Sequence, residues 1–304
     1  MNTQTHPELD SHQWRQVGFI TLAAIVIFAF LRWLPTGTTL SHMDFRVDAK
    51  NSIEFCDPLN PQFIPVVAMA SPVSLSIKAP TTQVGEPVRA TVTLQTSNGK
   101  PIATEDLLVV HTKRLHLLIT DPSLQDYQHV HPEPTGVPGE WSFAFTPQAT
   151  GAYRVFADFT PAATNRGLYA NADFTVQAST AAAVSRTEAR LPPGYAVKLT
   201  PASLPLRAKQ PIDLNFSVTR NDGGVVPLEP VMDAYAHLVA FDQSRSGFAH
   251  LHPMQSDLTQ PPDRVHPVLN FKITIPSAGR YVIWAQINLG GQETFVPFWF
   301  DVEA

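Results

Sequence analysis

Seven of the eleven histidines lie in two short segments that repeat one another. At a constant spacing of 121 residues, three histidines of the first segment fall on three of the second: His116, His129 and His131 correspond to His237, His250 and His252. Random placement would rarely align three such pairs, so the segments are copies of one unit. Neutral imidazoles bind zinc and copper, and three of them form a familiar ligand set.

Strand geometry would bring the three histidines of each copy together. In the run RLHLLIT, Leu117 and Ile119 share one face of a strand and His116 points to the other. His129 and His131 are two residues apart and therefore share a face. In an antiparallel hairpin, His116 lies opposite one of them and diagonal to the other, about 5 and 7 Å away. The sequence predicts one three-histidine metal site in each copy.

A fourth position differs between the copies and bears on the choice of metal. At the same spacing His111 falls on Met232, so the first site gains an imidazole and the second a thioether. Both groups bind copper, and the thioether favours Cu(I), whereas an all-nitrogen site suits Cu(II). We therefore expect copper, with zinc possible. His111 and His116 are five residues apart, so a bulge or loop must bring them to one face.

Neighbouring polar residues have structural interpretations. Asp121 and Asp242 are expected to cap the hairpin turns through their side chains. The single Cys56 excludes a disulfide within the chain and a four-cysteine zinc site. A blue-copper centre is excluded as well, since neither copy contains a cysteine. The remaining histidines are expected at the surface: His6, His12, His42 and His266.

The elements that position these histidines are strands. From about residue 71 the sequence consists of short β-branched and aromatic runs separated by Pro, Gly and Asn, without a long helical period. Residues 71–178 hold seven candidate strands, as an immunoglobulin-like sandwich requires, and the same order returns in 195–304. A polar, Ala-rich linker, 179–194, separates them. The fold is expected to be all-β, with two tandem immunoglobulin-like or cupredoxin-like sandwiches.

An apolar run precedes the sandwiches. Residues 17–34 are almost wholly apolar with arginines at both ends, and no small-residue cleavage pattern follows. This predicts an uncleaved, single-pass transmembrane anchor between a short tail, 1–16, and an irregular linker, 35–70. Lysine and arginine are balanced across the run, so they do not orient it. We expect the β-rich copies outside the cytoplasm.

Composition narrows the partners. Charged residues are only 15% of the chain, the net charge is -5, and no basic stripe is present. Nothing is available to neutralise a phosphate backbone, so nucleic-acid binding is excluded. The expected partners are the membrane, through residues 17–34, and a protein that donates or accepts the metal.

The two histidine segments also resemble a known family. The strings HTKRLHLLITDPSLQDYQHVHPE and AYAHLVAFDQSRSGFAHLHP, each followed by an aromatic strand and Gly-x-Tyr, resemble the YtkA-like domains of bacterial extracytoplasmic proteins. The resemblance covers about residues 71–304. It implies cupredoxin-related or immunoglobulin-like sandwiches, often membrane-anchored and often associated with copper or heavy-metal handling. It points to the six aligned histidines and to the periplasmic side of a bacterial cytoplasmic membrane.

Three functions are compatible with these features. The first is a membrane-anchored, extracytoplasmic protein that holds or passes on copper. The second is a structural or interaction module of a membrane assembly, with incidental surface histidines. The third, a metal-dependent enzyme, is not expected, because no nucleophile elbow, phosphate loop, HExxH motif or positioned carboxylate base is present.

Overall fold

The computed structural model describes residues 10–33, 40–46, 61–178 and 191–304. The chain divides into two compact units, Met1–Thr39 and Leu40–Ala304. Cys56 and His6 lie outside the described residues, as do parts of both predicted linkers.

The first unit contains one helix, α1, Ser11–Trp33. A capping box begins it: Asp10 Oδ1 accepts the Gln13 N–H at 2.7 Å, and Gln13 Oε1 accepts the Asp10 N–H at 2.9 Å. The stretch Ser11–Leu31 has a mean hydropathy of 1.8 and is long and apolar enough to cross a membrane. The helix begins six residues before the predicted span because the polar residues that follow the cap continue it. It fits a single-pass anchor.

The first repeat is a sandwich of two sheets. One sheet has the order β1-β3-β7-β6 and the other β2-β9-β8-β4-β5, with all pairs antiparallel except β2 and β9. The strands are β1 Val73–Lys78, β2 Thr82–Gln83, β3 Val88–Thr96, β4 Leu115–Thr120, β5 Tyr127–Val130, β6 Glu133–Pro134, β7 Glu140–Phe145, β8 Gly151–Phe159 and β9 Leu168–Gln177. Short 3-10 turns lie at His42–Phe45 (η1), Val66–Ala68 (η2) and Thr104–Asp106 (η3).

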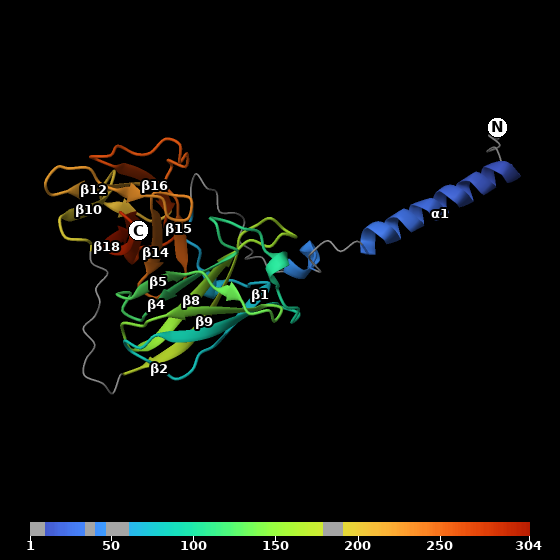
Figure 1. Cartoon of the computed structure of the whole chain (residues 1–304), viewed down its shortest axis with the longest axis horizontal. Coiled ribbons are helices and arrows are strands. Elements are labelled where there is room, and N and C mark those ends of the chain that lie inside the picture. The colour runs from blue at the N-terminus through green and yellow to red at the C-terminus, as the bar shows by residue number, and fades with distance from the viewer. Residues whose placement is uncertain (1–9, 34–39, 47–60, 179–190) are drawn as a thin grey trace. The chain divides into compact units, whose positions relative to one another are not determined.

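The second repeat has the same plan. Its sheets have the orders β10-β12-β16 and β11-β18-β17-β14-β15, and β13 pairs with β17. The strands are β10 Tyr195–Pro201, β11 Leu206–Arg207, β12 Pro211–Arg220, β13 Leu228–Glu229, β14 His237–Asp242, β15 Phe248–Leu251, β16 Val268–Thr274, β17 Gly279–Leu289 and β18 Gln292–Glu303. Figure 1 shows the two sandwiches, the first in cyan to yellow-green and the second in yellow to red. The predicted all-β fold of two tandem sandwiches behind an apolar helix is confirmed.

Each sandwich has its own core between its two sheets. Leu117 and Ile119 of β4 point into the first core, as their alternation predicts, and Leu238 and Ala240 of β14 point into the second. Every residue of β4 is nevertheless buried, including those on the opposite face. Something else must therefore cover the outer face of this sheet.

The second repeat covers that face. A third apolar cluster joins Leu118 and Phe156 of the first repeat to Val239, Phe241 and Trp284 of the second. Its aromatic rings are in direct contact, since Phe156 and Phe241 stack with their centroids 6.0 Å apart. The outer faces of the two sheets thus pack against each other, and β4 and β14, which carry His116 and His237, are buried on both faces.

The segment before the first repeat reinforces this packing. Ile64 exchanges two backbone hydrogen bonds with Phe248 of β15, with N···O distances of 2.8 and 3.1 Å. Gly247 makes the approach possible, because a Cβ there would lie only 1.7 Å from the Ile64 oxygen. Two arginines also cross the interface reciprocally: Arg154 donates to the Arg245 carbonyl at 2.8 Å, and Arg245 donates to the Ala152 carbonyl at 2.7 Å.

Truncating the interface cluster should destabilise both repeats together. Leu118 is fully buried, so Leu118→Ala is expected to lower the free energy of unfolding by about 2–5 kcal/mol. Denaturant unfolding should show one transition shifted as a whole, because the cluster belongs to both sandwiches. The control Val137→Ala, at a residue 57% exposed, should change stability by less than about 0.5 kcal/mol. Two separate transitions, with only the first one shifted, would contradict a shared cluster.

Candidate metal centre

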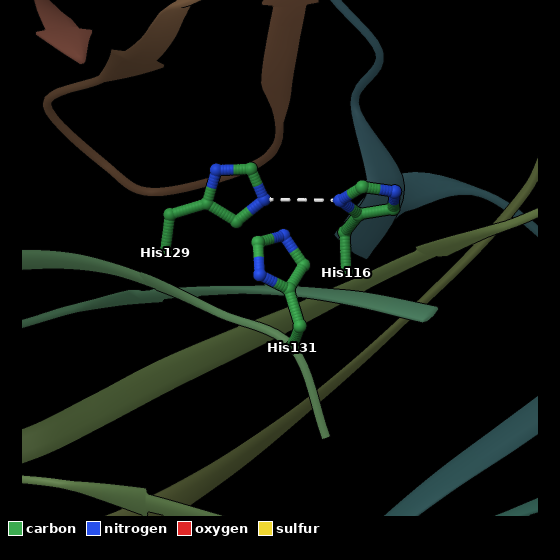
Figure 2. A group of neighbouring side chains, drawn as sticks. All are labelled: His116, His129 and His131. Atoms are coloured by element: carbon green, nitrogen blue, oxygen red, sulfur yellow. Dashed lines mark hydrogen bonds between the residues drawn. The ribbon is translucent and has the colours of Figure 1, made fainter. Parts of the chain in front are cut away.

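The six aligned histidines form two triads on the packed sheet faces. We call His116, His129 and His131 the first triad, and His237, His250 and His252 the second triad. In each, one ligand nitrogen from every histidine lies within 4.8 Å of the others. Figure 2 shows the three rings of the first triad turned toward one another. The predicted convergence of these histidines is confirmed.

The hairpin register explains the convergence. Leu118 pairs with His129 and Leu117 with Val130, and the same register sets His116 opposite His131. His116 is therefore opposite one partner and diagonal to the other, as expected. The hairpin of β14 and β15 repeats this register, with Val239 opposite His250.

The ring separations fit one ion in each triad. Centroid distances are 5.3, 4.9 and 4.7 Å in the first triad and 5.4, 4.8 and 4.8 Å in the second. Three imidazoles bound tetrahedrally to one ion, with metal–nitrogen bonds of about 2.0 Å, have centroids about 5 Å apart. The centroid spacing in both triads is therefore compatible with three imidazoles around one zinc or copper ion.

Hydrogen bonds outside the first triad fix where its protons sit. His116 Nε2 lies 3.0 Å from the Val110 carbonyl, which can only accept, so this nitrogen carries the proton. His129 Nδ1 donates to Gln286 Oε1 at 2.8 Å, and the Gln286 amide nitrogen in turn donates to Glu293. The inner nitrogens, His116 Nδ1 and His129 Nε2, then both carry lone pairs although they lie 3.2 Å apart.

The second triad repeats this arrangement. His237 Nε2 donates to the Val231 carbonyl at 2.9 Å, and His250 Nδ1 lies 3.2 Å from Asp158 Oδ2. The inner nitrogens, His237 Nδ1 and His250 Nε2, lie 3.3 Å apart. The third ring of each triad also leaves a nitrogen free, because the buried Nε2 atoms of His131 and His252 have no hydrogen-bond partner. Lone pairs that face one another in a buried site are stabilised by a cation between them.

Two matching turns set the carbonyls that orient the triads. Each is a two-residue turn with left-handed backbone at both central positions, as in a type I′ hairpin. The φ angles are 48° at His111, 68° at Thr112, 49° at Met232 and 61° at Asp233. The turn in the first repeat takes the place of the bulge or loop that the sequence required between His111 and His116. Its first residue, Val110, supplies the acceptor for His116.

The turn places His111 between the two triads. Its ring lies 6.4 Å from His116 of the first triad, but it is closer to the second triad, where it stacks on His252 at 3.8 Å and lies 5.9 Å from His237, all measured between centroids. His111 is thus near His116 as expected but packs most closely on His252, and its coordination of a metal stays a prediction. Met232 contacts the second triad through its carbonyl, which lies 3.2 Å from His237 Nε2. Coordination by its sulfur stays a prediction.

Burial keeps these imidazoles neutral. It lowers the pKa of His111 and of all six triad histidines, and takes the pKa of His131 to about 3 and that of His237 to about 4. Neighbouring imidazoles lower the pKa of His129 and His250 further, because two charged rings would repel each other. All seven rings are therefore neutral at pH 7, the state in which imidazole binds a metal.

Other residues singled out in the sequence have structural roles. Asp121 caps its hairpin turn by accepting the backbone N–H groups of Gln125 and Asp126, each at 2.8 Å. Asp242 accepts the Ser246 N–H at 2.7 Å in the second turn. Asp158 and Gln286 carry no sequence signal of their own, although Asp158 pairs in register with His116 and Gln286 with His237 on neighbouring strands.

Both repeats match a sequence family described as a domain of unknown function, DUF8832, over residues 69–180 and 189–304. The chain therefore belongs to this family. No curated protein matches it significantly. The YtkA-like resemblance is not confirmed by the family match.

Several solved structures match this chain at low similarity. The Escherichia coli adhesin FdeC is 16% identical, with 76% of this chain covering 63% of that chain and a TM-score of 0.24. Fibronectin(III)-like modules of Clostridium thermocellum CbhA are 11% identical, with 76% and 93% covered and a TM-score of 0.20. The chain spans 22% of an Escherichia coli alpha-2-macroglobulin, at 11% identity over 78% of its own length and a TM-score of 0.23. Similarities this low give no information about function.

The lowered histidine pKa values predict how the stability of the metal-free protein depends on pH. Because folding depresses these values, protons bind the unfolded chain preferentially below about pH 6.5. The stability is complete above that pH and is lost as pH falls toward the folded values of about 4 for His237 and about 3 for His131. Each such histidine contributes a slope of up to about 1.4 kcal/mol per pH unit.

Thermal unfolding of the metal-free protein between pH 7 and pH 5 measures this effect. The melting temperature should fall by several degrees, and His131→Asn should reduce the fall. The control His266→Gln, at an exposed histidine, should leave it unchanged. A melting temperature that is constant or rises over this interval would show that the triads are already protonated in the folded state.

Proposed function

We propose that this chain is a membrane-anchored, extracytoplasmic metal-binding protein that holds copper between its two repeats. One observation carries the proposal: in each triad, outer hydrogen bonds force two inner nitrogen lone pairs to face each other, at 3.2 and 3.3 Å. A bound cation would turn this repulsion into coordination. The role is to hold the ion or pass it on, without catalysis.

The ligand chemistry favours copper. Each triad offers three neutral nitrogens and neither contains a carboxylate, whereas magnesium and calcium select oxygen. Zinc and copper both suit imidazole. The triads are mostly buried, and a monovalent ion costs about a quarter of the desolvation energy of a divalent ion of equal size. Cu(I) is therefore the preferred occupant, and zinc is its main competitor.

The triads are also placed for exchange. His131 and His252 are partly exposed, while His116 and His237 are buried at 3% and 0% exposure. An ion would therefore reach each triad from the side of His131 or His252, whose side chains are partly exposed although their Nε2 atoms are buried. The same burial argues against the interpretation of these histidines as incidental surface groups.

Metal analysis of the untagged full chain tests the proposal. Cu(I) titrated against a chromophoric chelator should bind with a stoichiometry near two. The double substitution His129→Ala with His131→Ala should remove one equivalent and leave the β-type circular dichroism spectrum unchanged. The matched control, His42→Ala with His266→Ala, replaces two exposed histidines and should retain both.

If the protein binds no metal at micromolar concentration, the proposed metal site is wrong and the chain is better interpreted as an interaction module. If the protein binds zinc in preference to copper, the assignment of copper is wrong and zinc takes its place.

Topology is tested separately. With α1 as a single-pass anchor, a reporter fused after Ala304 should be active only outside the cytoplasm. The same reporter fused before Met1 should be inactive, because that end would lie in the cytoplasm. Activity of the C-terminal fusion in the cytoplasm would reverse the proposed orientation.

A further inference from the structure

We infer that the two triads are halves of one binuclear centre, in which each repeat completes the ligand environment of the other. This inference rests on the proposed metal binding and extends it. Independent sites, one per repeat, would have their supporting groups in their own repeat. His116 and His237 do have such partners in their own repeats, but the partners of His129 and His250 cross the interface, one in each direction.

The two triads are in ring contact. His250 of the second triad lies 5.4 Å from His129 and 5.9 Å from His116, measured between centroids. These separations approach those within a triad, where the largest centroid distance is 5.4 Å. With metal–nitrogen bonds of about 2.0 Å, ions in the two triads would be at most about 12 Å apart.

The outer hydrogen bonds are exchanged between the repeats. His129 of the first repeat donates to Gln286 of the second at 2.8 Å. Reciprocally, His250 of the second repeat lies 3.2 Å from the carboxylate of Asp158 in the first. Such outer partners set ring orientation and basicity, and their loss typically weakens metal binding by 10- to 100-fold. Each triad therefore depends on the opposite repeat.

His111 adds a third crossing contact. It belongs to the first repeat, yet its ring stacks on His252 of the second triad at 3.8 Å. It thereby places a fourth imidazole against the second triad, with its centroid 5.9 Å from that of His237 and 6.3 Å from that of His250. A residue of the first repeat thus packs directly on the second triad.

The crossing contacts also make the triads unequal. The Asp158 carboxylate lies within hydrogen-bond distance of His250, whereas the crossing partner of the first triad, Gln286, is uncharged. Asp158 also lies in register beside His116 of the first triad, so the difference between the triads rests on its direct contact with His250. A carboxylate hydrogen-bonded to a ligand ring favours the divalent ion, so the second triad should prefer Cu(II) and the first Cu(I). This order is the reverse of the one expected from His111 and Met232 in sequence alone.

Coupling between the ions is the first test. Cu(I) affinities are measured for the full chain and for two variants, His129→Ala with His131→Ala and His250→Ala with His252→Ala, which each keep one triad. Two unit charges at most about 12 Å apart, at an effective dielectric constant of about 20, weaken binding by about tenfold or more. The product of the two stepwise binding constants of the full chain should therefore be lower than the product of the two single-triad constants by at least that factor. Equal products would overturn the shared centre.

A measurement on the unsubstituted chain guards against variants that fail to fold. Loaded with two equivalents of Cu(II), the full chain should give an electron paramagnetic resonance spectrum broadened by dipolar coupling relative to one equivalent. A two-equivalent spectrum that is a simple sum of isolated Cu(II) signals would overturn the inference.

Substitutions across the interface form the second test. In the variant that keeps the second triad, His111→Ala should weaken Cu(II) binding about tenfold or more, while the control Val109→Ala, at an exposed neighbour, should not. In the variant that keeps the first triad, Gln286→Ala should weaken Cu(I) binding about 10- to 100-fold, unlike Gln292→Ala at an exposed glutamine.

The outcomes separate the two proposals. If metal binds but His111→Ala and Gln286→Ala have no effect on the opposite triad, the repeats hold independent sites and only the shared centre fails. If the full chain binds no metal, the proposed function and the shared centre fail together.

Discussion

The packing of two sheet faces against each other is the constraint on which the rest of the structure depends. Leu118 and Phe156 of the first repeat and Phe241 of the second close an apolar cluster that neither sandwich possesses alone. Strands β4 and β14 are thereby buried on both faces, an unusual environment for antiparallel strands. A polar side chain on the covered face must form a hydrogen bond, and an ionisable one must stay neutral, because burying an unpaired polar or charged group costs free energy. The histidines stand at the end of this cluster, where the sheet faces turn from apolar to polar.

Hydrogen bonding from outside then determines what the histidines can do inside. The carbonyls of Val110 and Val231 each accept a hydrogen bond from one ring N–H of a triad, and the Gln286 and Asp158 side chains each accept a hydrogen bond from another. The ring nitrogens that face the middle of each triad therefore carry lone pairs and no proton. A buried group of neutral histidines costs desolvation whether or not a metal is present, and the depressed pKa values express that cost. The protein thus keeps two groups of converging imidazole nitrogens neutral at pH 7.

Duplication produced this arrangement and also its asymmetry. Two copies of one hairpin, facing each other, place equivalent residues on opposite sides of the interface. A residue that differs between the copies can then act on the partner's triad, as His111 does on His252 and Asp158 on His250. A tandem repeat can therefore build unequal sites from nearly equal parts.

The sequence by itself determined the two β repeats, the apolar helix and the grouping of each triad, because strand alternation and hairpin register are local rules. His116, His129 and His131 needed only the period of a strand and one antiparallel pairing to converge. Only the tertiary structure decided what lies on the far side of that strand face. The direction of His111 depends on a left-handed turn, and the hydrogen bonds of His129 and His250 come from residues more than 90 positions away. Such contacts follow from how one sheet packs on another, and no periodicity within either repeat encodes that packing.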